Sequence, residues 1–163
     1  MSERRVVKVG MADLKIAKQP EILTTLGLGS CVGIALYDPS IRLGGLAHIM
    51  LPDSKQIKNN DNKAKFADTA VEILVENMLA QGARKSKIVA KIAGGAHMFE
   101  FKNMDEMMRI GTRNVAAVIQ ILQQLSIPII AQDTGSNYGR TIELHTDTGM
   151  LLVKTIGHGI KEI

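Results

Sequence analysis

The chain is organised around residues 24–51, whose sequence is TTLGLGSCVGIALYDPSIRLGGLAHIML. Residues 31–37 are continuously apolar, which is typical of a strand covered on both faces. Turn-forming residues follow at 38–40, and residues 43–51 form a second strand-like run. Antiparallel pairing of the two runs would bring Cys31, at the start of the first, and His48, near the end of the second, to the same end of a sheet.

Cys31 is the only cysteine in the chain, and it lies at the mouth of a glycine-rich loop. A lone thiol with a histidine elsewhere in the fold is a candidate nucleophile. There are four histidines that could act as its base: His48, His97, His145 and His158. His48 is favoured by the strand pairing, and His97 comes second because it follows another glycine-rich turn. The alternative is a buried cysteine that only fills space, which is the usual role of a free cysteine.

The glycines around Cys31, at positions 27, 29 and 33, do not match a nucleotide-binding loop. Their spacing is G-x-G-x-x-x-G, a strand-like run rather than a helix follows, and the Gly-Lys-Ser/Thr of a phosphate loop is absent. Glycines beside a nucleophile have another use, because they allow backbone N–H groups to face a developing oxyanion. Gly29 and Ser30 are therefore the candidate oxyanion residues.

Composition narrows the classes of function. The 163 residues carry a net charge of +4, but the basic residues are scattered and form no run with interleaved aromatics, so we expect no nucleic-acid partner. One cysteine and four dispersed histidines offer no clustered ligand spacing, so we expect no metal. A single cysteine suits a reducing compartment. Neither a secretory signal nor an apolar run of about 20 residues is found, and we expect a soluble cytoplasmic protein without membrane insertion.

The remaining patterns predict an α+β fold. Helical periodicity covers residues 64–81 and 114–125, and the other strand-like runs are 6–9, 14–17, 22–26, 87–92, 128–131, 140–145 and 150–156. Several runs are joined as hairpins, which favours a mixed or antiparallel β-sandwich flanked by helices. We expect a single domain over residues 1–163, with a core at 6–156 and a tail at 157–163. The run 87–92 ends at Gly94 and Gly95, where glycines predict a close backbone approach.

Several motifs resemble one known family. They are GLGSC at 27–31, HIMLPDS at 48–54, KFADTA at 65–70, KIAGGA at 91–96, IGTRN at 110–114 and DTG at 133–135. Together they look like the signature of the CheD chemoreceptor glutamine deamidases, and the resemblance runs from about residue 6 to about residue 156. One departure is Ser136, where the family pattern leads us to expect a second glycine.

The resemblance implies hydrolysis of selected glutamine side chains to glutamates on methyl-accepting chemotaxis receptors. By the same carry-over, Cys31 is the nucleophile, His48 is the base and later the acid, and Thr25 orients the imidazole. The family has a cysteine-hydrolase α/β-sandwich fold and requires no cofactor. The family also binds CheC, a phosphatase of the phosphorylated response regulator CheY.

Two other functions stay open at this level. The chain could be an adaptor that binds CheC, with catalysis secondary or lost. Phe99, Phe101 and Met104 are apolar residues in an otherwise polar, irregular stretch and form the candidate partner surface, although core packing explains them equally well. A general cysteine amidase or esterase that acts on small substrates is the third interpretation.

Overall fold

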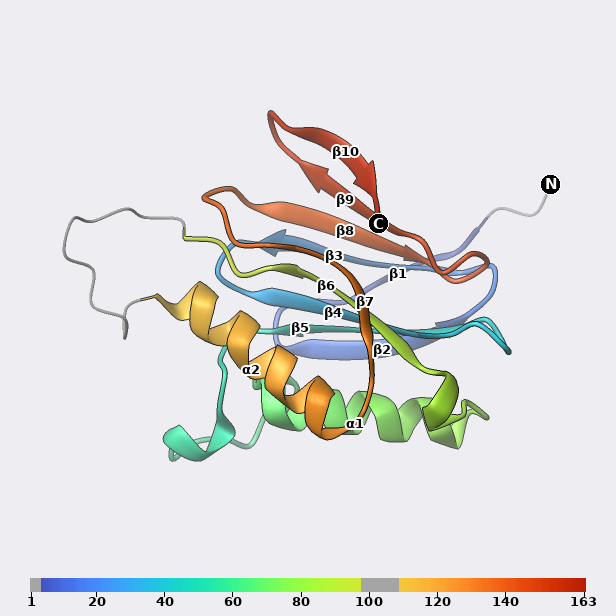
Figure 1. Cartoon of the computed structure of the whole chain (residues 1–163), viewed down its shortest axis with the longest axis horizontal. Helices are drawn as coiled ribbons and strands as arrows, with labels where there is room; N and C mark the ends of the chain where they lie inside the picture. Colours follow the sequence, from blue (N-terminus) through green and yellow to red (C-terminus); the bar gives the residue numbers. More distant parts are fainter. Residues whose placement is uncertain (1–3, 98–108) are drawn as a thin grey trace.

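The computed structural model describes residues 4–97 and 109–163, which form three layers (Figure 1). Two five-stranded sheets lie face to face, and two helices cover the free face of one of them. The outer sheet has the strand order β1-β3-β8-β9-β10, and the central sheet has the order β2-β5-β4-β6-β7. The strands are β1 Val6–Lys8, β2 Asp13–Lys18, β3 Ile22–Leu28, β4 Val32–Asp38, β5 Leu43–Ile49, β6 Val89–Gly94, β7 Ile129–Thr134, β8 Arg140–His145, β9 Leu151–Thr155 and β10 Gly159–Glu162.

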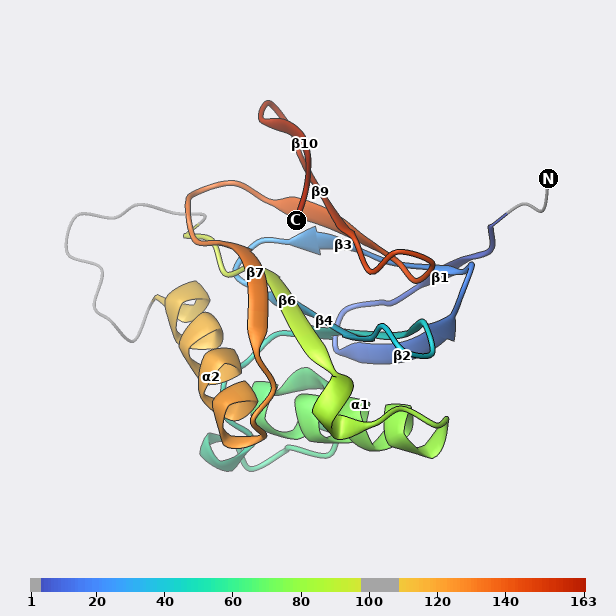
Figure 2. The same cartoon turned by 45° about the vertical axis from the view of Figure 1, so that its right-hand side comes forward.

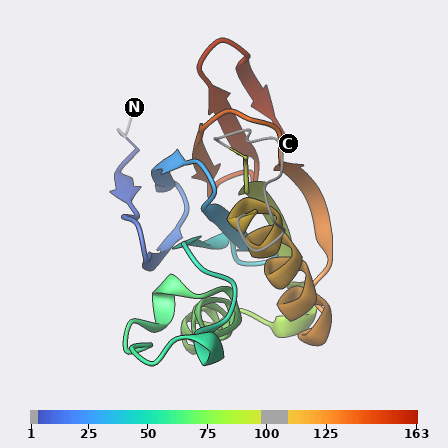
Figure 3. The same ribbon diagram turned by 90° about the vertical axis from the view of Figure 1, so that its left-hand side faces the viewer.

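The helices α1 (Ala67–Ala80) and α2 (Ile110–Gln124) lie side by side beneath the central sheet (Figures 2 and 3). The buried side chains of α1 recur at helical spacing and include Ala70, Leu74 and Met78. Three short 3-10 helices lie in the connections: Ser54–Gln56, Lys63–Lys65 and Lys85–Lys87. None of the helices in the described residues combines the length and the apolar character needed to span a bilayer.

The central sheet is buried on both faces, and β4 shows this along its whole length. Val32, Ile34 and Leu36 pack against the helices. Cys31 and Ala35 point to the opposite face and pack against the outer sheet. This confirms the prediction of a strand that is covered on both faces.

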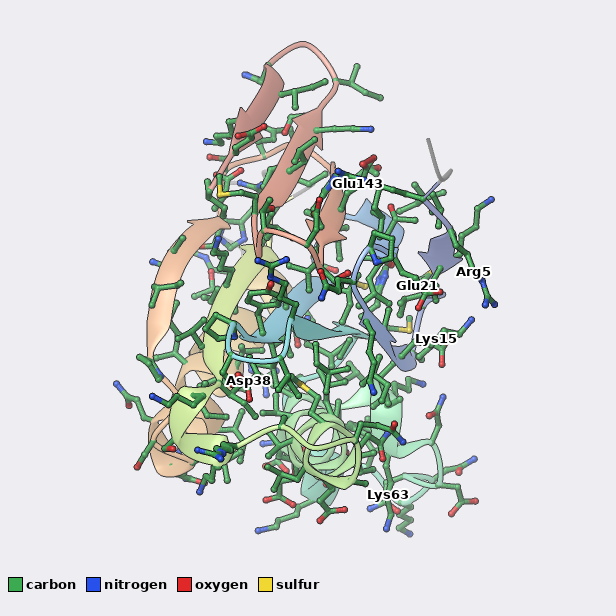
Figure 4. The ribbon with its side chains drawn as sticks, turned by 90° about the vertical axis from the view of Figure 1, so that its right-hand side faces the viewer. Arg5, Lys15, Glu21, Asp38, Lys63 and Glu143 are labelled. Atoms are coloured by element: carbon green, nitrogen blue, oxygen red, sulfur yellow. The ribbon has the colours of Figure 1, made fainter. Side chains whose placement is uncertain are left out.

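β4 and β5 pair as an antiparallel hairpin, and the register sets Gly33 opposite His48. The turn at the other end is held by the buried carboxylate of Asp38, whose position Figure 4 labels. This carboxylate accepts hydrogen bonds from Ser40 and from the Arg84 N–H. Burial would raise the pKa of Asp38, but these hydrogen bonds outweigh it and hold the pKa below its ordinary value. The hairpin is therefore anchored at the end opposite Cys31.

The α+β sandwich predicted from the sequence is confirmed, and so are the hairpins β4–β5 and β8–β9. The parallel pairs β1–β3 and β6–β7 make both sheets mixed, as that prediction allows. Two details differ. The helix α2 begins at Ile110 instead of residue 114. Residues 159–162, within the stretch expected to be a tail, form β10 and pair with β9. The glycines and polar residues of this segment do not predict a strand, but it forms one because it pairs with the edge strand β9.

Candidate active site

Cys31 lies in the short loop between β3 and β4. In Figure 3 the end of the sandwich that carries this loop faces the viewer. All three carbonyls of this loop are hydrogen bonded. The Gly29 carbonyl accepts from the Ala96 N–H and the Cys31 carbonyl from the Gly95 N–H, both at 2.9 Å. The Ser30 carbonyl accepts from the side chain of Asn114 at 3.0 Å. The backbone around the thiol is consequently held in one conformation.

Glycines at the end of β6 make this contact possible. Gly94 has a φ of +110°, and a Cβ atom there would lie 2.3 Å from the Cys31 carbonyl oxygen. Gly95 has a φ of +68°, and a Cβ there would lie 2.3 Å from Val115. This confirms the prediction of a close backbone approach at Gly94 and Gly95, and it shows that the approached group is the proposed nucleophile's own peptide.

His48 faces the outer sheet from β5. Its register partner Gly33 lies beneath Ile142 of β8, because a Cβ on Gly33 would come within 2.5 Å of Ile142 Cδ1. Ile142 in turn is the register partner of Thr25 in β3. The two cross-strand pairs therefore stack on each other, with Ile142 over Gly33 and Thr25 over His48.

The Thr25 hydroxyl connects His48 to the backbone. Thr25 Oγ1 lies 2.7 Å from the Val9 carbonyl oxygen and 2.7 Å from His48 Nδ1. A carbonyl can only accept, so the single hydroxyl proton goes to Val9 and Oγ1 accepts from the imidazole. We therefore assign the Nδ1–H tautomer to His48, which leaves a lone pair on Nε2.

His48 is fully buried, and its Nε2 has no hydrogen-bond partner among the described residues. A buried polar atom without a partner is costly, and such atoms recur where a ligand or a reacting group completes the set. The side chain of Cys31, which is 8% exposed, lies on the same face of the central sheet. The ladder ends at Val32 and Ile49, and its register continued by one residue would make Cys31 and His48 diagonal neighbours on that face.

Burial favours the uncharged form of both groups. It lowers the pKa of His48 below its ordinary value. It also raises the pKa of Cys31, although a hydrogen bond from the Cys31 backbone N–H opposes that rise. The resting pair is therefore a thiol and a neutral imidazole, and such a pair makes a thiolate by moving one proton from sulfur to Nε2 as sulfur attacks.

The other three histidines have contacts of their own elsewhere in the fold. His97 contacts Thr112 at 2.9 Å through Nε2, His145 lies 3.4 Å from Glu143, and His158 stacks on Tyr138 with ring centroids 4.3 Å apart. The structure thus joins Thr25 to His48 and places the Cys31 side chain on the same face of the central sheet, with Gly29 and Ser30 in the adjoining loop. In the described part of the chain, no group of three or more His, Cys, Asp or Glu side chains is placed to hold a metal ion.

An open pocket of about 310 Å³ adjoins Thr25. It lies between the end of β1 and β3, and Met11 and Leu26 at its rim are more than half exposed. Its lining is mostly apolar, so it adds no ionisable group to the site except Lys8. The candidate partner residues Phe99, Phe101 and Met104 lie outside the described residues.

Sequence reasoning missed Asn114. It is fully buried near the start of α2, and it contacts the Cys31 loop. A signal was present, because Asn114 is the one polar residue in a helical stripe that continues with Val118, Ile121 and Leu122. Asn114 ends the motif IGTRN, but the motif by itself assigns no role to its asparagine.

Comparison with known proteins gives consistent matches. The family model described as "CheD chemotactic sensory transduction" matches residues 50–155. Curated relatives named "Probable chemoreceptor glutamine deamidase CheD" cover nearly the whole chain. That of Caldanaerobacter subterraneus subsp. tengcongensis is 58% identical over 161 residues, 99% of each chain. That of Lachnoclostridium phytofermentans is 56% identical over 158 residues, 97% of this chain and 98% of the relative. Among solved structures, the Bacillus licheniformis hypothetical protein YfiH aligns at 17% identity with a TM-score of 0.48, over 81% of this chain and 60% of that chain.

Proposed function

This chain belongs to the CheD family, and we propose from that membership that it converts glutamine side chains of chemoreceptors to glutamates. We further propose that the reaction uses Cys31 as nucleophile, His48 as base and acid, and Thr25 to orient His48. The observation that carries this proposal is the hydrogen-bond chain from the Val9 carbonyl through Thr25 to His48. It leaves Nε2 of His48 with a lone pair, and with no hydrogen-bond partner in the part of the chain that the structure describes, on the face of the sheet that bears the Cys31 thiol.

In the first half-reaction, Sγ of Cys31 attacks the carboxamide carbon while its proton moves to Nε2 of His48. The carbonyl oxygen becomes an oxyanion, which backbone N–H groups of the loop at Gly29, Ser30 and Cys31 are suited to stabilise. His48 then returns the proton to the nitrogen. Ammonia leaves, and a thioester between Cys31 and the substrate remains.

In the second half-reaction, water attacks the thioester carbon and gives a proton to Nε2 of His48. The second tetrahedral intermediate collapses, the carbon–sulfur bond breaks, and His48 returns the proton to the sulfur. The products of the two steps are ammonia and a side-chain carboxylic acid, which releases its proton to solvent and becomes glutamate. Throughout, the Nδ1–H of His48 stays hydrogen bonded to the Thr25 hydroxyl, so the imidazolium that forms in each step keeps its orientation.

The test uses cytoplasmic fragments of chemoreceptors as substrate. After incubation with the protein, mass spectrometry maps the glutamines that have become glutamates. We expect conversion by the wild type and a loss of at least about 10³-fold for Cys31→Ala and His48→Ala. His97→Ala is the matched control, because it removes an imidazole that contacts Thr112 and not Thr25. Conversion of glutamine to glutamate by the Cys31→Ala variant would rule out Cys31 as the nucleophile.

Binding of CheC is the second element of the proposal, and it rests on the family resemblance. We expect the chain to bind CheC, and Cys31→Ala to leave that binding intact, as measured by titration calorimetry. Near-normal chemotaxis of cells that carry Cys31→Ala would favour the adaptor function over the catalytic one. Turnover of free glutamine would instead favour a general amidase.

A further inference from the structure

We propose that Asn114 is a positioning residue that holds the peptide group between Ser30 and Cys31, so that the Cys31 N–H faces the thiol side of the sheet. There, this N–H is available to the oxyanion of the reaction. The inference rests on the proposed function for its catalytic consequence, but the position of the N–H does not depend on the substrate.

The side-chain amide of Asn114 uses both of its hydrogens. Nδ2 donates to the Ser30 carbonyl at 3.0 Å and to the Met50 carbonyl at 3.0 Å. Both partners are carbonyls and can only accept, so the amide has one possible orientation. Asn114 is fully buried, and its Oδ1 has no partner within residues 4–97 and 109–163. A buried amide that leaves its own acceptor unsatisfied is costly, so the two contacts that it makes are the reason for its place.

The two carbonyls flank the candidate catalytic pair. Ser30 immediately precedes Cys31, and Met50 follows His48 by two residues. The backbone pairing of β4 and β5 stops at Val32 and Ile49, so both carbonyls lie just beyond the end of the hairpin. Asn114 is 84 residues from Ser30 and 64 residues from Met50 in sequence. Its side chain joins the two strand ends at the point where the backbone hydrogen bonds between β4 and β5 have ended.

The direction of the Cys31 N–H follows from the planarity of the peptide bond. In a trans peptide the carbonyl and the N–H point in opposite directions. The Ser30 carbonyl points to α2, on the helix side of the central sheet, so the Cys31 N–H points away from the helix. The Cys31 side chain packs on that same side, against the outer sheet. Within the described residues, the Cys31 N–H finds no backbone acceptor.

The two causes that shift the Cys31 pKa agree with this geometry. Burial raises its pKa, and a hydrogen bond from its own backbone N–H lowers it. The second effect requires the N–H to lie on the side of the sulfur, where Asn114 is proposed to hold it. The same donor can stabilise the negative charge first on sulfur and then on the substrate oxygen.

The test compares Asn114→Asp with Val118→Ala in the full chain. Asn114→Asp keeps the shape of the side chain but replaces the donor with an acceptor. Val118→Ala removes buried apolar volume from the same helix without touching the loop. Alkylation of the sole cysteine by iodoacetamide, followed by mass spectrometry over a range of pH, reports on Cys31 alone. Deamidation of receptor fragments supplies kcat and KM.

For Asn114→Asp we expect kcat to fall by about 10²-fold with little change in KM, which is the effect of losing one oxyanion donor. We also expect the alkylation midpoint to move to higher pH. Val118→Ala should change neither quantity once the folded fraction is taken into account. Asn114→Ser, which places no charge beside the carbonyls, should reproduce both shifts if Asn114→Asp fails to fold.

An alkylation profile identical to that of the wild type in a folded Asn114 variant would overturn the proposal and leave Asn114 a purely structural residue. Equal losses of kcat in Asn114→Asp and Val118→Ala would also overturn it. If the wild type does not deamidate receptor fragments, the proposed function fails, while the alkylation comparison still decides whether Asn114 positions the Cys31 peptide.

Discussion

Thr25 Oγ1 lies 2.7 Å from His48 Nδ1, although the two residues belong to different sheets. This distance depends on how closely the sheets approach. Gly33 has no side chain, so Ile142 can lie directly over it, and the neighbouring pair of Thr25 and His48 comes within hydrogen-bonding distance. The glycine beside the histidine is therefore part of the site, although it carries no reactive group.

Gly33→Ala should consequently separate the sheets locally. A Cβ there would lie 2.5 Å from Ile142 Cδ1, and overpacking of this kind costs about 1–3 kcal/mol of unfolding free energy. Adding Ile142→Val removes the clashing methyl group, so the double variant should regain stability and deamidation relative to Gly33→Ala. Urea unfolding measures the coupling. Strictly additive losses would contradict this account of the Gly33–Ile142 contact.

Thr25→Val removes the hydroxyl but keeps the shape of the side chain. The Nδ1–H of His48 and the Val9 carbonyl both lose their partner, and the imidazole is free to adopt the other tautomer. We expect kcat to fall by about 10²-fold and the unfolding free energy to fall by about 1–3 kcal/mol. Thr25→Ser keeps the hydroxyl and should retain most of the activity. Equal activity of the two variants would show that the hydroxyl does not orient His48.

The rate should depend on pH through His48. Burial lowers its pKa below the ordinary value of 6.5, and the base works only when it is neutral. The acid limb of kcat/KM, which reports on the free enzyme, should therefore have its midpoint below pH 6.5. A midpoint above pH 6.5 would mean that a group other than a buried neutral His48 controls the rate.

Stability should follow the same groups. For His48 the folded pKa lies below the unfolded one, so the unfolded state binds more protons in that interval and stability falls as pH drops below 6.5. For Cys31 the folded pKa lies above the ordinary 9.0, so its contribution is full below 9.0 and is lost at higher pH. Thermal unfolding over this range should show a shallower acid slope for His48→Asn and a shallower alkaline slope for Cys31→Ala.

Gly94→Ala and Gly82→Ala form a matched pair. Both glycines have a positive φ, +110° and +103°, so alanine is strained at either position. A Cβ at Gly82 would meet nothing within 4 Å. At Gly94 it would lie 2.3 Å from the Cys31 carbonyl oxygen, which is a backbone atom and so cannot be removed by a second substitution. We expect a cost of about 1 kcal/mol for Gly82→Ala and a larger cost, with altered Cys31 alkylation, for Gly94→Ala. Equal destabilisation by Gly94→Ala and Gly82→Ala would show that the Cys31 loop can move away from a Cβ at position 94 at no cost.

Local patterns predicted a large part of the fold. The β4–β5 hairpin followed from an apolar run, a Pro39 turn and a second apolar run, because neighbouring strands pair with little loop-closure cost. α1 followed from its helical periodicity. The parallel pairs β1–β3 and β6–β7 did not, because their partners are set by competition among several strands of similar apolar character.

The sequence by itself determined that Cys31 and His48 lie at the same end of one hairpin. The two strands are consecutive in the chain, so antiparallel pairing sets the start of the first beside the end of the second. The family resemblance also named Thr25, but only the tertiary structure shows how Thr25 reaches His48, and only it shows that Asn114 contacts the Cys31 loop. Thr25 reaches His48 from the opposite sheet, and Asn114 reaches the Ser30 carbonyl from a helix on the other face. Both contacts join residues that are far apart in the chain, and they form only when three independently built layers pack at the distances that Gly33, Gly94 and Gly95 allow.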